Sequence, residues 1–131
     1  MALYLVNAFS ATMLNISADG DSYLRFRELD EGEVKRMLSE GFESAVGHAG
    51  TADVLAERLG VPVKANRIPV KLQKAGDRLI VAQIEWPGGR LAEGQVLSAE
   101  EVKKLRIKFL LVEDVTLEVK KSLKHAGGLS L

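Results

Sequence analysis

The sequence contains no cysteine, and other residues that bind transition metals are scarce. Its 131 residues include only two histidines, His48 and His125. Disulfide bonds, thiolate zinc sites and cysteine nucleophiles are therefore excluded, and the absence of cysteine fits a reducing compartment. Two histidines are too few for a transition-metal site within one protomer. The sequence thus predicts a protein without a bound metal or other cofactor.

A charge excess of either sign is also missing. Eighteen Lys and Arg residues balance eighteen Asp and Glu residues, so the formal net charge is zero. A protein that binds duplex DNA through its phosphates usually carries a large basic excess. The balanced charge argues against duplex DNA as a partner, whereas a few local cations are enough for a small ligand that carries phosphates.

Long apolar stretches are absent as well. Uninterrupted apolar runs such as residues 109–112 are far short of a membrane span. Residues 1–4 include no basic side chain, which argues against a secretion signal. We expect a cytoplasmic protein that makes no contact with membranes; for a virus-encoded protein, the compartment is the host cytoplasm.

What is present is the composition and length of one folded domain. Hydrophobic residues make up 47% of the chain and charged residues 27%, values typical of globular proteins. Five segments rich in β-formers are predicted as strands: 3–8, 22–29, 67–73, 78–86 and 106–113. The turn at 74–77 is predicted to join the third and fourth of them as a hairpin.

Three helices are predicted from capping residues. Asp30 with Glu33, and Ser98 with Glu101, have the spacing of capping boxes. Thr51 is predicted to cap the helix between them, which a glycine at position 60 would end.

These elements predict an α/β fold in a single domain. Both hairpin-like and crossover connections occur, so we expect a mixed sheet of about five strands with helices mainly on one face. This domain covers residues 1–115, and residues 116–131 are expected to be a polar C-terminal tail.

His48 is the first candidate for chemistry, because it stands between glycines directly before a predicted helix. A histidine in such a loop is most often an exposed bystander or a helix-capping group. It is also well placed for phosphoryl chemistry, because N–H groups at a helix start attract phosphate and an imidazole titrates near neutral pH. The residues alone leave both interpretations open.

Arg90 and Glu93 form a second candidate site in a glycine-rich loop. The plain interpretation is a solvated ion pair that adds almost nothing to stability. The functional interpretation is a guanidinium for a phosphate beside a carboxylate that positions a hydroxyl or the histidine. Asn7 and Ser10, at the end of the first strand, either satisfy a turn or present donors into a cleft.

Motifs of common enzyme classes are absent: the sequence has no GxGxxG, GxxxxGK(S/T), GxSxG or HExxH. Several other segments occur in a distinctive order: NAFSxxML within 5–14, GHxxT within 46–51, then 66–67, 70–72 and 81–84, and RLxEG at 90–94. In this order they resemble the viral type III anti-CRISPR ring nucleases, small proteins of archaeal viruses and phages with relatives in bacterial CRISPR loci. The resemblance spans residues 3–113. The loop at 86–89 is longer than in the shorter members.

The resemblance implies a homodimer that binds cyclic tetra-adenylate, the second messenger of type III CRISPR defence, and cuts it to linear di-adenylate. It implies that His48 is the general acid, Glu93 its catalytic partner and Arg90 a contact to phosphate, from the same protomer or its partner. It also implies a set of residues that line the ligand pocket: Asn7, Ser10, Thr51, Arg67 and Gln83.

The implied chemistry agrees with the residues present. An RNA-type linkage carries its own nucleophile, the 2′-hydroxyl, so cleavage requires alignment, charge stabilisation and a proton donor but no metal. A fourfold ring on a twofold axis would meet two identical sites. The alternatives are a module that sequesters the cyclic nucleotide without cutting it and a viral regulator that binds nucleic acid.

Overall fold

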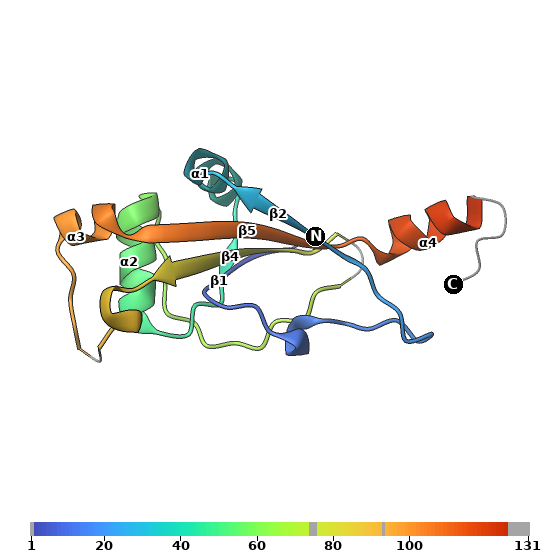
Figure 1. Ribbon diagram of the computed structural model, residues 1–131, viewed down its shortest axis with the longest axis horizontal. Coiled ribbons are helices and arrows are strands. Elements are labelled where there is room, and N and C mark those ends of the chain that lie inside the picture. The colour runs from blue at the N-terminus through green and yellow to red at the C-terminus, as the bar shows by residue number, and fades with distance from the viewer. Residues whose placement is uncertain (1, 74–75, 93, 126–131) are drawn as a thin grey trace.

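The chain folds into one five-stranded sheet with helices around it (Figure 1). The computed structural model describes residues 2–73, 76–92 and 94–125. The elements are β1 (Leu3–Val6), the 3-10 helix η1 (Ala11–Met13), β2 (Leu24–Leu29), α1 (Glu31–Ser39), β3 (Glu43–Ser44), α2 (Ala49–Leu59), β4 (Arg78–Glu85), the 3-10 helix η2 (Pro87–Gly89), α3 (Ala99–Lys104), β5 (Arg106–Asp114) and α4 (Thr116–His125).

The sheet is mixed, with the strand order β2-β5-β4-β1-β3. β1 is parallel to both β3 and β4, whereas β5 is antiparallel to both β4 and β2. The predicted α/β fold with a mixed sheet of about five strands is confirmed.

Two helices begin with the capping boxes that the sequence predicts. The Asp30 carboxylate accepts a hydrogen bond from the Glu33 N–H (2.8 Å), and the Glu33 carboxylate accepts one from the Asp30 N–H (3.2 Å). Ser98 and Glu101 make the same pair at α3, and the hydrogen bond from the Ser98 N–H holds the pKa of Glu101 below its usual value. Each box satisfies two N–H groups that a helix start otherwise leaves unpaired.

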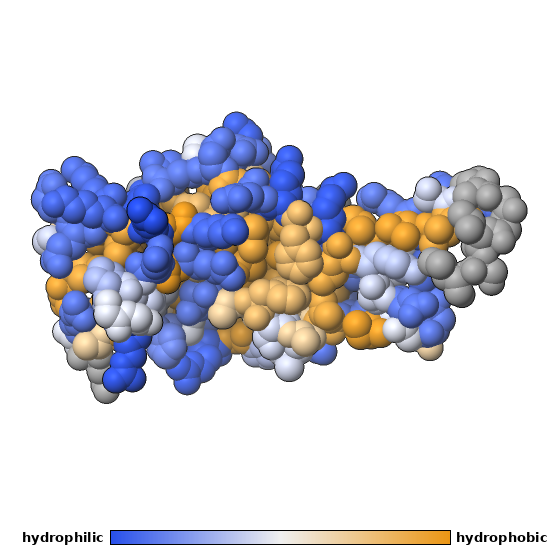
Figure 2. Space-filling view, in the orientation of Figure 1, coloured by the Kyte–Doolittle hydropathy of each residue, from blue (hydrophilic) through white to orange (hydrophobic). Residues whose placement is uncertain are grey.

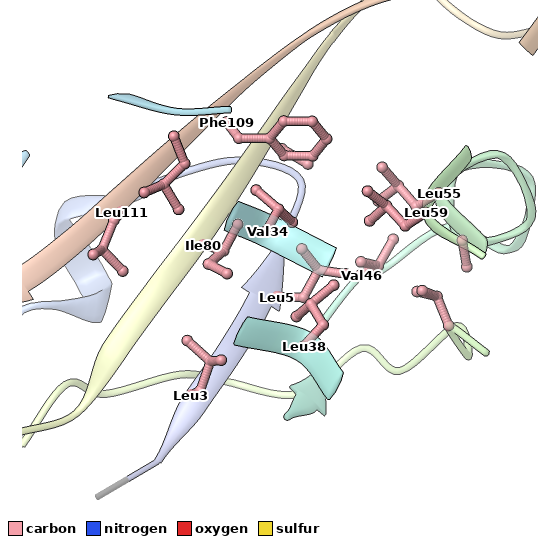
Figure 3. Packing of buried hydrophobic residues seen from close by; sticks show 14 residues of the cluster. Leu3, Leu5, Val34, Leu38, Val46, Leu55, Leu59, Ile80, Phe109 and Leu111 are labelled. Carbon is pink, nitrogen blue, oxygen red and sulfur yellow. The ribbon is translucent and has the colours of Figure 1, made fainter. Parts of the chain in front are cut away.

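Helices α1 and α2 cover one face of the sheet, as predicted. The buried residues labelled in Figure 3 form this layer: Leu3, Leu5, Val34, Leu38, Val46, Leu55, Leu59, Ile80, Phe109 and Leu111. Leu5, Val34 and Leu55 have no exposed surface. Burial of an aliphatic side chain of this size contributes about 1.5–3 kcal/mol. This layer therefore fixes α2 against the sheet. It thereby also fixes the position of His48, which precedes the first turn of α2.

Residues 67–73 do not form the predicted strand, so the predicted hairpin is wrong. Both edges of β4 are already paired, one with β1 and the other with β5, and Pro69 has no N–H to give to a strand. The segment instead crosses the second face of the sheet, where Val70 and Leu72 are buried. The Leu72 N–H donates to the Met13 carbonyl (2.8 Å). The fifth strand of the sheet is the short β3.

The second face of the sheet keeps an open apolar surface. Phe26 of β2 is 52% exposed and meets Phe9 edge to face, with ring centroids 5.6 Å apart. Figure 2 shows apolar residues gathered over the middle of the visible face, where β4 and β5 run, and continuing along α4. Exposed apolar surfaces of this kind usually mark contacts with other molecules.

The C-terminal segment contains a helix where the sequence predicts only a tail. The buried Thr116 hydroxyl accepts a hydrogen bond from the Tyr23 N–H (2.9 Å) at the start of α4. Lys120 pairs with Asp19, and this hydrogen bond holds the pKa of Asp19 below its usual value. Figure 1 shows α4 at the opposite end of the molecule from α2 and α3. No helix in the described part of the chain is long and apolar enough to cross a membrane.

Arg58 of α2 joins three helices. Its Nε donates to the Glu31 carboxylate at the start of α1 (2.7 Å). One of its terminal nitrogens donates to the carbonyls of Val102 (3.0 Å) and Leu105 (2.8 Å) at the end of α3. The Val102 carbonyl also accepts a hydrogen bond from the Leu105 N–H (3.2 Å), so Arg58 adds a second bond there and gives the Leu105 carbonyl a charged donor. Its side chain is 19% exposed, which shields these bonds from solvent.

Replacing Arg58 by alanine is expected to lower the free energy of unfolding by about 2–3 kcal/mol, because hydrogen bonds to a charged group are lost. Urea unfolding followed by circular dichroism measures this as a lower midpoint with an unchanged slope. Lys35→Ala is the matched control: Lys35 contacts the same Glu31 at 3.6 Å but is 49% exposed, so its loss should cost no more than about 0.5 kcal/mol. Equal effects of the two substitutions would contradict this role of Arg58.

Candidate functional site

The carboxyl ends of three parallel strands point toward the same end of the sheet, and candidate residues follow each of them. β1, β3 and β4 run in the same direction. Asn7 follows β1, His48 follows β3 and Arg90 lies in the loop that follows β4. Figure 1 shows α2 beside the carboxyl end of β4. Open α/β sheets bind ligands at this end of their parallel strands, which makes it the place to look for a site.

His48 is the residue from which α2 begins. Its backbone is extended (φ −121°, ψ 130°), and its carbonyl accepts the hydrogen bond of the Ala52 N–H (2.9 Å). The imidazole is exposed and makes no capping hydrogen bond. The capping alternative therefore does not describe this side chain. The N–H groups of the first turn lack partners within the helix and carry the positive end of its dipole, next to the imidazole.

Thr51 lies inside the first turn of α2, so its predicted role as the cap is wrong. The helix begins earlier than the sequence predicts, with His48 as its N-cap. Thr51 and Ala52 are buried in the fold, with exposures of 6% and 1%. A side chain so buried offers a ligand little surface. What Thr51 presents at the helix start is its backbone N–H.

Arg67 is brought beside the loop that carries His48. A Cβ built on Gly47 would lie 3.5 Å from Nε of Arg67. The neighbouring Asn66 fixes this arrangement, because its N–H donates to the Val46 carbonyl (2.8 Å) and its side-chain amide donates to a carbonyl at the end of β3 (2.7 Å). The structure therefore places a guanidinium group next to the glycine that precedes His48.

The loop after β4 reaches the same turn of α2. A Cβ built on Gly50 would lie 2.7 Å from Cδ2 of Leu91, so the residue next to Arg90 packs directly on the start of the helix. Arg90 itself is exposed, and the two glycines before it have positive φ values of 79° and 87°, which glycine adopts without strain. Glu93 lies outside the described residues, so its predicted ion pair with Arg90 stays a prediction.

Ser10 has the structural role that the sequence left as one alternative. Its hydroxyl accepts a hydrogen bond from the Thr12 N–H (3.3 Å) at the start of η1 and shares another with the Thr12 hydroxyl (2.9 Å). Ser10 is nevertheless exposed, and Asn7 is half-buried in the bend after β1. Their predicted contacts with a ligand stay predictions.

Gln83 lies on the second face of β4 and lines a groove of about 590 Å³ at the end of β4 and the start of β5. The groove is lined by Glu28, Arg58, Gln83, Ile84, Glu85, Leu105, Arg106, Ile107 and Lys108. His48, Arg67 and Arg90 are not in its lining, so the candidate residues do not share one closed pocket in a single protomer. No three His, Asp or Glu side chains of the described residues come together to hold a metal ion.

Sequence reasoning missed two features of this region. Lys108 of β5 stands directly opposite Gln83 in the strand register, which adds a positive charge beside a predicted ligand contact. The contact of Leu91 with Gly50 was missed as well. The strand pairing that aligns Lys108 with Gln83 joins residues far apart in the sequence, so no local pattern signals it. For Leu91, the only local signal is its position directly after Arg90.

These observations define a small α/β protein with cationic groups and a helix start at the carboxyl end of its sheet. Residues 3–111 match the family described as STIV B116-like, and the chain belongs to this family. It is 36% identical to the ORF116 protein of Acidianus filamentous virus 1, over 80% of this chain and 85% of that one. It is also 36% identical to protein 26 of a Sulfolobus islandicus filamentous virus, over 88% of this chain and 94% of that one.

The fold is shared with a solved structure, that of B116 from Sulfolobus turreted icosahedral virus. The two align with a TM-score of 0.69 and 29% identity, over 86% of this chain and 99% of that one. A relationship with proteins of archaeal viruses, predicted from the sequence, is therefore confirmed at the level of the family. The ring-nuclease activity stays a prediction. Helix α4 lies beyond the residues that match the family.

Proposed function

We propose that the protein is a homodimeric, metal-independent ring nuclease that binds cyclic tetra-adenylate and cuts it to linear di-adenylate. In the cytoplasm of an infected cell, this reaction would switch off type III CRISPR signalling. The observation that supports the proposal best is the position of His48 at the start of α2, with Arg67 beside its loop and the Arg90 loop packed on the same turn. The identity of the ring comes from the resemblance of the sequence motifs.

The proposed reaction uses the ring's own 2′-hydroxyl. Its oxygen attacks the adjacent phosphorus as the hydroxyl proton passes to solvent water. The bond from phosphorus to the 5′-oxygen breaks, and a 2′,3′-cyclic phosphate forms. His48 gives a proton to the leaving 5′-oxygen. Arg90 and the first-turn N–H groups of α2 stabilise negative charge on the phosphate oxygens. Glu93 either positions the 2′-hydroxyl or keeps the imidazole protonated.

The candidate residues do not share one closed pocket within a single protomer, and a twofold dimer would bring two sets of them to one ligand. The open apolar surface on the second face of the sheet, with Phe26 half-exposed, supports contact with a second copy. Two copies related by a twofold axis would present two sets of His48, Arg67 and Arg90 to one ring. Two opposite linkages would then be cut, which gives two molecules of linear di-adenylate.

Incubation of the purified protein with cyclic tetra-adenylate and excess EDTA tests the proposal. We expect complete conversion to linear di-adenylate, with a 2′,3′-cyclic phosphate on the early product, identified by liquid chromatography and mass spectrometry. Light scattering should give a dimer, and calorimetry should give one ring per dimer. A strict requirement for a divalent metal would contradict the mechanism. Recovery of the bound ring intact would instead indicate a sequestering module.

A further inference from the structure

Leu91 contacts the first turn of α2 at Gly50, two residues beyond His48. A Cβ built on Gly50 would lie 2.7 Å from Cδ2 and 3.9 Å from Cγ of Leu91. The leucine side chain therefore occupies the space that any larger residue at position 50 would need. The φ of Gly50 is not in the left-handed region, so the backbone does not require glycine here. A Cβ at position 50 would instead require the tip of the Leu91 side chain to shift.

This contact fixes the first part of the loop that follows β4. Beyond Leu91, a groove of about 270 Å³ lies between the loop and α2, with Gly50 on one wall and Val96 on the other. The loop returns to the hydrophobic core at Leu97, which packs on the cluster shared by α2 and α3. Leu91 is thus the residue next to Arg90 whose apolar contact attaches the loop to α2. The next such contact along the loop is made by Leu97, on the far side of the groove.

We propose that Leu91 is a positioning residue: by packing on Gly50 it holds Arg90 at the start of α2, where His48 lies. The inference rests on the proposed ring cleavage, because it assigns Arg90 and the helix start to the same phosphate. Leu91 touches no reacting atom. It keeps the guanidinium group within reach of the phosphate, and small displacements of such a group are costly to the rate.

Gly50→Ala separates positioning from folding. Alanine is a better helix former than glycine, so this substitution should leave the urea midpoint unchanged or raise it. The added methyl group requires the Leu91 side chain to shift, and the proposed role predicts that Arg90, its neighbour in the chain, is displaced with it. Lower activity without lower stability is therefore the signature of a positioning contact, whereas a contact that serves stability alone would lower both.

Trypsin provides a readout that needs no ring, because it cuts after Arg90. Gly50→Ala leaves the residues at this bond unchanged, and we expect it to raise the rate of cleavage between residues 90 and 91 about tenfold in the native protein, followed by mass spectrometry. Leu91→Ala should do the same, and Leu91→Met should restore the wild-type rate. Val96→Ala is the matched control, since Val96 is in the same loop and 88% exposed. An unchanged rate in Gly50→Ala would overturn the proposal.

Single-turnover cleavage of cyclic tetra-adenylate, at saturating protein, provides the second readout. Gly50→Ala and Leu91→Ala should lower the rate about 10- to 100-fold, and the double variant should be no slower than Leu91→Ala alone, because the two residues act through one contact. Wild-type rates in both single variants would overturn the positioning role and leave the proposed function intact. A wild-type protein that never cuts the ring would overturn the proposed function, and the trypsin arm would still decide whether Leu91 holds the loop.

Discussion

Replacing His48 by alanine is expected to leave ring binding intact and to lower the single-turnover rate by about 10²–10⁴-fold, the usual contribution of a general acid. The side chain is exposed and makes no capping hydrogen bond, so its removal takes no capping interaction away from α2. Single-turnover cleavage with saturating protein measures the rate, and calorimetry with the same variant measures the dissociation constant. The two measurements separate a chemical role of the imidazole from a role in binding.

Two further variants make this test specific. His48→Asn introduces a side chain that is favoured at a helix start but cannot transfer a proton at neutral pH, so it should fold at least as well as the wild type and remain inactive. His125→Ala removes the other histidine, at the end of α4 and far from α2 in Figure 1, and should cleave normally. If His48→Ala cuts the ring at the wild-type rate, His48 is a bystander and another group supplies the proton.

The parts of the fold that the sequence predicted correctly are those decided by local chemistry. The capping boxes at Asp30 and Ser98 involve residues three apart, so their spacing alone identifies both helix starts. The strand 106–113 agrees with β5 to within one residue. Burial alternates along residues 106–111 of this strand, as expected where a strand presents its side chains to the two faces of a sheet.

The parts that it missed depend on contacts between distant residues. The turn at 74–77 favours a hairpin locally, but both edges of β4 pair with strands from elsewhere, and the preceding segment crosses the second face of the sheet instead. The polar composition after residue 115 predicts a tail. The hydrogen bond between Tyr23 and Thr116 and the pair of Asp19 with Lys120 connect α4 to a loop near the other end of the sequence.

In the candidate site, too, the features set by neighbouring residues were predicted and those set by distant contacts were not. The position of His48 before a helix follows from local residues, and the structure confirms it. That Thr51 is buried rather than capping depends on how α2 packs, which propensity does not encode. Arg67 reaches the loop of His48 because Asn66 bonds to Val46, a pairing that no motif announces.

Substitutions of Arg90 and Glu93 are expected to have large and different effects on ring binding and on the rate of cleavage. Arg90→Ala is expected to weaken ring binding about 10- to 100-fold, because a guanidinium group attracts the phosphate before the reaction begins. It should also slow cleavage, because the guanidinium group stabilises the negative charge that builds up on the phosphate oxygens in the transition state. Glu93 has the wrong charge to attract a phosphate, so its benefit has to come from positioning the 2′-hydroxyl or from keeping His48 protonated. Glu93→Gln should therefore bind the ring equally well or more tightly while its single-turnover rate falls about 10²-fold.

Dissociation constants and single-turnover rates at one fixed salt concentration separate the two roles, since ionic strength itself changes the attraction between Arg90 and phosphate. Lys124→Ala is the matched control for the loss of a cation, because Lys124 lies on α4 at the opposite end of the molecule. It should change neither quantity. A Glu93→Gln variant that binds much more weakly but cuts what it binds at the normal rate would show that the carboxylate serves binding. The proton transfer would then depend on His48 without help from position 93.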